Sequence, residues 1–314
     1  MPPCLYHPHE ISLQGHADAV VRLRALLENA FPASRRVASI HHSAAALVQP
    51  EIDGHVVRLD LAGTVSRWEL PAHPDPALLS QLSASADLAL LQGTSSPGSL
   101  KLMVVDAETP MEAMVGAVAL VGDVPPERTP PGGIPFFHPS EIEELAAYLE
   151  DLVQTNVREK PLLGLVAGNR SPDAVTELAS FLDGLVAAAF VVSDVASSAL
   201  LPSWVRPMNR SLGGVGFVGD LIEAASALPG SGLLVISGRE GEMPTRQAVE
   251  HLIEARDPLA DATAFRGSED SLPRNGAVLW EAKGLMRLWS FLGTGLRCPQ
   301  RILNQCRTNL VEPL

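Results

Sequence analysis

Two stretches of similar design decide the fold of this chain. One is Leu162-Leu163-Gly164-Leu165-Val166-Ala167-Gly168-Asn169-Arg170-Ser171, and the other is Ile11-Ser12-Leu13-Gln14-Gly15-His16-Ala17-Asp18. Each begins like a strand and passes through a glycine-bearing turn toward a helical pattern, a geometry that presents backbone N–H groups to phosphate. Neither turn contains the Lys that normally reaches the β- and γ-phosphates. The sequence therefore predicts two nucleotide-binding frameworks that lack their usual chemistry.

Short apolar runs alternate with helical patterns along the rest of the chain, as in α/β proteins with mostly parallel sheets. In the first half we predict strands at 37–40, 56–61, 88–91, 100–105 and 115–121, and helices at 17–30, 76–83 and 140–152. In the second half we predict a strand that starts at Leu162, strands at 190–193, 233–237 and 263–265, and helices at 173–187, 216–227, 245–255 and 285–292.

A polar connection over residues 155–161 separates the two halves. We place the domain boundary there, which gives one domain over 1–158 and a second over 159–314. With 314 residues in the chain, each half is long enough to bury a core of its own. The predicted fold class is α/β, with two doubly wound, mostly parallel-sheet domains.

Composition excludes several classes of protein. A formal net charge of -13 without any Lys/Arg cluster argues against nucleic-acid binding. The cysteines, Cys4, Cys298 and Cys306, lack metal-ligand spacing, and their odd number suits a reducing compartment. No signal-peptide pattern opens the chain, and no apolar run approaches a membrane span. We therefore expect a cytoplasmic protein without a membrane partner.

A further glycine-rich turn, Arg210-Ser211-Leu212-Gly213-Gly214-Val215-Gly216, opens a helical pattern one strand unit downstream of Gly168. Together the two turns could form the walls of a ligand cleft at the carboxyl edge of a parallel sheet. Close packing of helix on sheet would explain the same glycines equally well. The residues alone leave both interpretations open.

The second half resembles the molybdenum cofactor guanylyltransferase family over residues 161–314. Gly168-Asn169-Arg170-Ser171 is similar to that family's Gly-Gly-Xaa-Ser loop, and Ser211-Leu212-Gly213-Gly214 to its Pro-Leu-Gly-Gly turn. The tail carries the best match, in Arg256-Asp257-Pro258, Asp261-Ala262-Thr263-Ala264-Phe265-Arg266, Leu279-Trp280-Glu281 and Cys298-Pro299-Gln300-Arg301-Ile302-Leu303-Asn304. The resemblance implies a nucleotidyltransferase-like Rossmann fold.

The resemblance also implies which residues line a surviving ligand cleft: Gly168, Asn169, Ser171, Leu212, Gly213, Gly214 and Arg239. Two departures remove the family's chemistry. Its phosphate-binding Lys is absent, because Pro172-Asp173 follows the first loop, and its Mg²⁺-holding Asp corresponds to Arg239. A guanidinium cannot replace a metal-binding carboxylate, although Glu240 or Glu242 could in principle hold a metal instead. We assign no catalytic and no metal-binding residue.

The first half resembles the molybdopterin-guanine dinucleotide biosynthesis adaptor, a P-loop GTP-binding family, over residues 1–158. Asp87-Leu88-Ala89-Leu90-Leu91-Gln92-Gly93 is similar to its Asp-Leu-Val-Leu-Val-Glu-Gly segment, and Val37-Ala38-Ser39-Ile40-His41-His42 to its strand that ends in Lys-His. The family's Gly-Lys-Thr-Thr falls on Gly15-His16-Ala17-Asp18, which lacks the Lys and the Mg²⁺-binding hydroxyl. The acidic residue of the later strand is Gln92, so the resemblance implies a degenerate P-loop.

Together these resemblances favour a catalytically degenerate fusion that serves molybdenum cofactor biosynthesis or insertion as a binding, carrier or scaffold protein. Its expected ligands are molybdopterin or the guanine dinucleotide. Its expected partners are molybdoenzymes, other proteins of cofactor biosynthesis or a second copy of itself. One alternative is an active guanylyltransferase that uses GTP and Mg²⁺. Another is a protein-interaction module whose ancestral clefts have closed.

Overall fold

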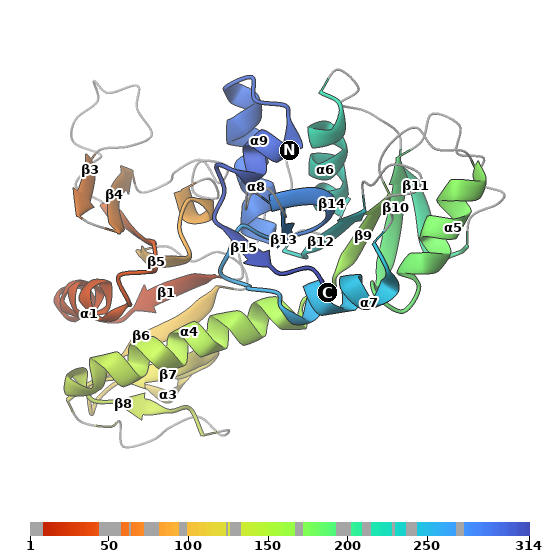
Figure 1. Cartoon of the computed structure of the whole chain (residues 1–314). Coiled ribbons are helices and arrows are strands. Elements are labelled where there is room, and N and C mark those ends of the chain that lie inside the picture. The colour runs from red at the N-terminus through yellow and green to blue at the C-terminus, as the bar shows by residue number, and fades with distance from the viewer. Residues whose placement is uncertain are drawn as a thin grey trace. The chain divides into compact units, whose positions relative to one another are not determined.

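A computed structural model describes residues 9–43, 58–62, 64–71, 82–93, 99–123, 125, 133–166, 172–192, 202–208, 215–227, 230–236, 244–267 and 273–314. They form an N-terminal unit that ends at Asn156 and a C-terminal unit that begins at Val157 (Figure 1). Both units are α/β, and each contains one mostly parallel sheet. This architecture confirms the predicted fold class.

The N-terminal unit is built on a sheet with the strand order β3-β4-β2-β5-β1-β6-β7-β8. Neighbouring strands are parallel except β3 and β4. Its strands are β1 (Glu10–Gln14), β2 (Val37–Ser43), β3 (Arg58–Ala62), β4 (Val65–Pro71), β5 (Leu88–Gln92), β6 (Leu100–Val104), β7 (Ala117–Val121) and β8 (Phe136–Phe137). Its helices are α1 (Ala17–Ala30), α3 (Met111–Met114), the 3₁₀ turn η2 (Pro139–Glu141) and α4 (Ile142–Glu159).

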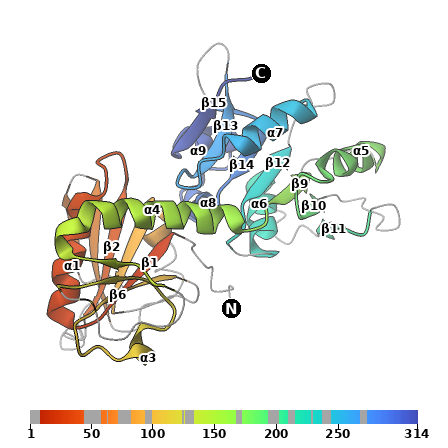
Figure 2. The same cartoon turned by 90° about the horizontal axis from the view of Figure 1, so that it is seen from below.

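The helix α4, which lies across this sheet in Figure 2, is longer than its sequence pattern suggested. Residues 155–159, predicted as part of a polar connection, are helical. The reason is a buried stripe that recurs every four residues and continues past position 152, formed by Leu145, Leu149, Val153 and Val157. A spacing of four keeps these side chains on one face of a helix. The tertiary packing of that stripe outweighs the polar residues between its members.

The C-terminal unit has the strand order β11-β10-β9-β12-β14-β13-β15. Its strands are β9 (Leu163–Val166), β10 (Ala188–Val192), β11 (Val205–Met208), β12 (Leu233–Ile236), β13 (Ala262–Arg266), β14 (Pro273–Trp280) and β15 (Thr308–Val311). Only β14 is antiparallel to its neighbours. The helices are α5 (Pro172–Leu182), α6 (Phe217–Ala227), α7 (Arg246–Glu254), α8 (Ala282–Gly293) and α9 (Pro299–Leu303).

Two hydrophobic clusters cover opposite faces of this sheet. Along β12, Leu233 and Val235 belong to the cluster that includes α6 and α8, whereas Leu234 and Ile236 belong to the cluster that includes α5 and α7. This alternation follows the period of two along a strand. A central strand buried on both faces explains why its sequence is a continuous apolar run.

Several edge and late elements differ from the sequence prediction. The strands β4, β11, β14 and β15 and the short helix α9 were not predicted, because polar residues or prolines interrupt their apolar patterns. The helix predicted at 173–187 ends at Leu182, and Gly184 then adopts a positive φ of 74° that ends helical geometry. Most of the helix predicted at 76–83 lies outside the described residues.

The start of α8 packs so closely on the chain that only glycine fits at position 284. A Cβ added to Gly284 would lie 2.1 Å from the backbone oxygen of Asp261. We expect Gly284→Ala to destabilise the protein by about 1–3 kcal/mol or more, because the backbone must shift to relieve this overlap.

The matched control is Gly293→Ala at the end of the same helix, where an added Cβ would meet nothing within 4 Å. It should change stability by less than about 1 kcal/mol. Differential scanning calorimetry of both variants measures the difference. Equal transition temperatures for the two would show that the close approach of Gly284 is not needed.

Candidate functional site

In the C-terminal unit, the strand order places a topological switch point between β9 and β12. The chain leaves β9 toward β10 on one side, and later returns to add β12 on the other side. Val166 pairs with Ile236, so the carboxyl ends of these two strands lie side by side. Open α/β sheets bind their ligands in the crevice outside such ends.

The predicted binding residues belong to segments that leave this carboxyl edge. The segment after β9 contains Gly168, Asn169 and Ser171, and the segment after β12 contains Arg239. The segment after β11 contains the predicted turn, which starts beyond Met208 at the edge strand of the sheet. All seven predicted residues lie outside the described residues: Gly168, Asn169, Ser171, Leu212, Gly213, Gly214 and Arg239.

Arg256 and Glu281, which lie in the C-terminal stretch with the predicted family motifs, form a buried ion pair rather than an open site. The guanidinium of Arg256 donates to both carboxylate oxygens of Glu281, over 2.6 and 2.7 Å. The exposed fraction of the side chain is 8% for Arg256 and 1% for Glu281. Arg256 follows α7, and Glu281 joins β14 to α8. The pair therefore links the segment after α7 to the connection between β14 and α8 in the interior of the unit.

A second buried carboxylate, Asp261, organises the start of β13. Its side chain is fully buried, it accepts a hydrogen bond of 2.8 Å from the backbone N–H of Arg307, and it forms an ion pair with Arg287. The ammonium of Lys283, itself 2% exposed, lies 3.9 Å away. These contacts join β13, α8 and the segment before β15. Arg256, Asp261 and Glu281, which carry the resemblance in the tail, thus have structural roles.

In the N-terminal unit, the turn between β1 and α1 requires glycine. Gly15 has a φ of 134°, and a Cβ at this position would lie 2.7 Å from the backbone oxygen of Val104 at the end of β6. His16 follows as the N-cap residue of α1, without a hydrogen bond from its side chain to the helix. The first amides of a helix have no partner within it. This turn therefore directs uncapped backbone donors toward the carboxyl edge of the sheet.

Strand register places Gln92 beside this turn. Gln92, the last residue of β5, pairs with Leu13 on β1 and with His41 on β2. All three side chains lie on the sheet face that α1 covers. That face is identified by Arg67 on β4, which pairs with Ser39 and donates to Glu28 of α1 over 2.7 Å. His41 lies two residues beyond Ser39, so it points the same way.

Gln92 is a buried polar side chain with an unmet hydrogen-bonding group. It is 6% exposed, and its amide oxygen has no hydrogen-bond partner among the described residues. Leaving a buried acceptor unpaired costs about 1–3 kcal/mol. The sequence pointed to this position only as the place of a lost carboxylate. Its burial and its orphan oxygen are apparent only in three dimensions.

Positive charge is scarce at this edge. The segments that follow β1, β2, β5 and β6, at 15–16, 44–57, 93–99 and 105–110, contain no Lys or Arg. Asp18 lies in the first turn of α1, and Asp106 follows β6. The hydroxyl of Thr109 donates to Asp106 over 2.7 Å and holds the pKa of that carboxyl below its usual value. These four segments therefore supply none of the positive charge that a triphosphate needs.

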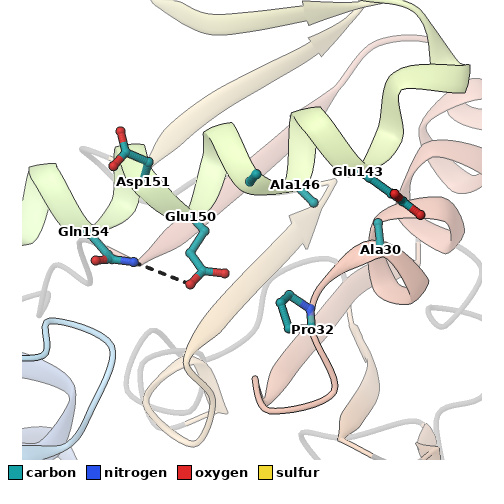
Figure 3. A pocket seen from close by; sticks show the side chains of 8 residues that line it. Ala30, Pro32, Glu143, Ala146, Glu150, Asp151 and Gln154 are labelled. Carbon is teal, nitrogen blue, oxygen red and sulfur yellow. Dashed lines mark hydrogen bonds between the residues drawn. The ribbon is translucent and has the colours of Figure 1, made fainter.

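A separate pocket lies away from this edge, between the end of α1 and the outer side of α4 (Figure 3). Its volume is about 350 Å³, and small residues form much of it together with Glu143, Glu150 and Asp151. Glu150 is already paired with Arg35 and accepts a weak hydrogen bond from Gln154. None of the residues predicted to bind ligands lines this pocket.

The described residues contain neither a cluster of potential metal ligands nor a helix suited to a membrane. No group of three or more His, Cys, Asp or Glu side chains in the described ranges could hold a metal ion. Glu240 and Glu242, considered as metal ligands, lie outside these ranges. Within the described part of the chain, no helix has the length and apolar character that crossing a membrane requires.

Comparisons with known proteins give only distant structural matches. The sequence matches no protein-family model and no curated protein. A crystal structure of a protein from Aquifex aeolicus is similar with a TM-score of 0.40 and 13% identity, over 50% of this chain and 88% of the other. A molybdopterin-guanine biosynthesis protein B is similar with a TM-score of 0.29 and 17% identity, over 46% of this chain and 98% of the other. The chain thus has a distant structural likeness to these proteins over about half of its length.

The structural role of the tail residues is testable by neutralising one partner of the buried pair. Glu281→Gln leaves the guanidinium of Arg256 without its countercharge, so we expect a loss of about 3–5 kcal/mol of stability. Glu250→Gln is the matched control, because Glu250 pairs with Arg246 at the surface, over 3.0 Å, with both side chains nearly half exposed. That change should cost no more than about 1 kcal/mol. Thermal unfolding that gives similar losses for both variants would contradict the assigned role.

Proposed function

We propose that this protein serves molybdenum cofactor biosynthesis or insertion by binding molybdopterin or its guanine dinucleotide, without catalysing nucleotidyl transfer. It acts as a carrier or scaffold that presents the ligand to a molybdoenzyme or to another protein of cofactor synthesis. The ligand cleft is the carboxyl edge of the C-terminal sheet, at the switch point between β9 and β12. This proposal combines the motif resemblance with the retained geometry of both units.

One observation carries the proposal: in both units a parallel strand and a helix flank the position of the expected turn, while the sequence lacks the residues for metal-dependent phosphate chemistry. In the N-terminal unit, Gly15 keeps the tight turn beside Val104, but His16 and Ala17 stand where the resembled family has Lys and Thr. In the C-terminal unit, the tail residues that match the family stabilise the fold. Nucleotidyl transfer requires a metal to neutralise the triphosphate and orient pyrophosphate. A retained scaffold without these groups favours binding over turnover.

Isothermal titration of the full-length protein tests this function. We expect molybdopterin to bind with a Kd below about 10 µM, the range of specific small-ligand sites. GTP should bind weakly or not at all, with or without Mg²⁺, because neither turn has a Lys in the family position, the first turn also lacks its Mg²⁺-binding hydroxyl, and Arg239 stands where the second family has its Mg²⁺-holding Asp. Magnesium-dependent micromolar binding of GTP would instead support an active transferase. Absence of binding to all of these compounds would favour a protein-interaction module.

Substitution of Arg239 tests whether the segment after β12 contacts the ligand. Arg239→Ala should weaken binding of an anionic ligand by about tenfold, the usual size of one lost charge-assisted hydrogen bond. Arg206→Ala on the edge strand β11 is the control, because Arg206 is exposed there and no site residue was predicted on that strand. Equal affinities for both variants would remove Arg239 from the site.

A further inference from the structure

The edge of the N-terminal unit beside α1 has a buried polar group, the Gln92 amide oxygen, without a hydrogen-bond partner among the described residues. We propose that this edge binds an uncharged heterocyclic lactam, a ring in which an N–H lies next to a C=O. In this complex the amide oxygen of Gln92 accepts a hydrogen bond from the ring N–H. The inference rests on the proposed function only in its choice of pterin and guanine as the rings to test. It concerns the unit that was expected to have lost its ligand.

Strand register brings Gln92, a buried acceptor, close in the fold to the start of α1. The amide oxygen of Gln92 is buried without a partner among the described residues, on the sheet face covered by α1. Gln92 pairs with Leu13, and α1 begins only three residues after β1 ends. The first amides of this 14-residue helix have no capping side chain. A ligand that satisfies both groups must offer a donor next to an acceptor.

The charged residues near this edge favour an uncharged ligand. The connections that leave β1, β2, β5 and β6 carry no Lys or Arg, whereas Asp18 and Asp106 lie along this edge. The positive end of the α1 dipole is equivalent to only about half an elementary charge. Phosphate groups would therefore meet net repulsion at close range. A neutral ring has no such cost, and its C=O can still accept from the helix amides.

The resembled family has an acidic residue at the position of Gln92, and the amide suits a different ligand. An amide is uncharged, so it neither attracts Mg²⁺ nor becomes ionised near Asp18. Its oxygen accepts an N–H directly, as the lactam of a pterin or a guanine provides. Burial makes this contact selective, since only a ligand that brings a donor satisfies an acceptor that is already buried and unpaired in the free protein.

The test is a fluorescence or calorimetric titration of the full-length protein in EDTA at pH 6.5, where the lactam N–H stays protonated, with four probes: pterin, 3-methylpterin, guanosine and GTP. We expect pterin, guanosine or both to bind, the preferred ring identifying the source of the lactam. GTP should bind no more tightly than guanosine, because the edge repels phosphate. Blocking the ring N–H in 3-methylpterin should weaken binding at least about tenfold relative to pterin.

Gln92→Leu supplies the decisive variant. It should weaken binding of the preferred ring at least about tenfold, and 3-methylpterin should then bind the variant nearly as well as pterin does, because the N–H to oxygen contact is already absent. The melting temperature should stay unchanged or rise, since the substitution removes an unpaired buried polar group. Gln14→Leu is the control: Gln14 ends the neighbouring strand on the opposite face, and its amide contacts Ser12. That variant should keep wild-type affinity within about twofold.

Three results would overturn the inference: no lactam binding, tighter binding of GTP than of guanosine, or unchanged ring affinity in Gln92→Leu. A lower melting temperature for Gln92→Leu together with unchanged affinity would assign Gln92 to the fold. Failure of this site can be distinguished from failure of the proposed function. Molybdopterin that binds wild type and Gln92→Leu equally well would leave the proposed function standing and remove only this site.

Discussion

The structure depends on the parallel pairing of strands around β1 and β9, which places the carboxyl ends of neighbouring strands at one edge of each sheet. In the N-terminal unit, this pairing sets Gln92 beside Leu13 and leaves Gly15 so close to Val104 that no side chain fits. In the C-terminal unit, it sets Val166 beside Ile236. Each edge is thus the position where open α/β sheets commonly bind ligands.

The buried charged residues of the C-terminal unit stabilise its fold and do not form an open ligand site. Arg256 and Glu281 form a bidentate pair with almost no exposure, and Asp261 is surrounded by basic side chains and a backbone donor. Breaking such a pair is costly because one charge stays buried alone. The stability of the fold is therefore a sufficient reason for these charged side chains to be buried.

The sequence predicted the architecture well wherever a strand or helix is buried along a regular period. The helix α1 was predicted with the observed bounds, and β5 and β12 were recognised from their apolar runs. Elements that depend on partners distant in sequence were missed, such as β14, which pairs antiparallel with β12 and β13. The candidate site at Gln92 also depends on partners that are distant in sequence. Its position was visible in the sequence, but its burial and its neighbours depend on strand register.

We propose that this protein binds its ligand without metal-dependent nucleotidyl transfer. The most direct measurement is formation of molybdopterin guanine dinucleotide from molybdopterin and GTP by the pure full-length protein, with Mg²⁺ or Mn²⁺ supplied. The account predicts no turnover above a protein-free control with either metal. Formation of the dinucleotide by the wild-type protein would contradict it.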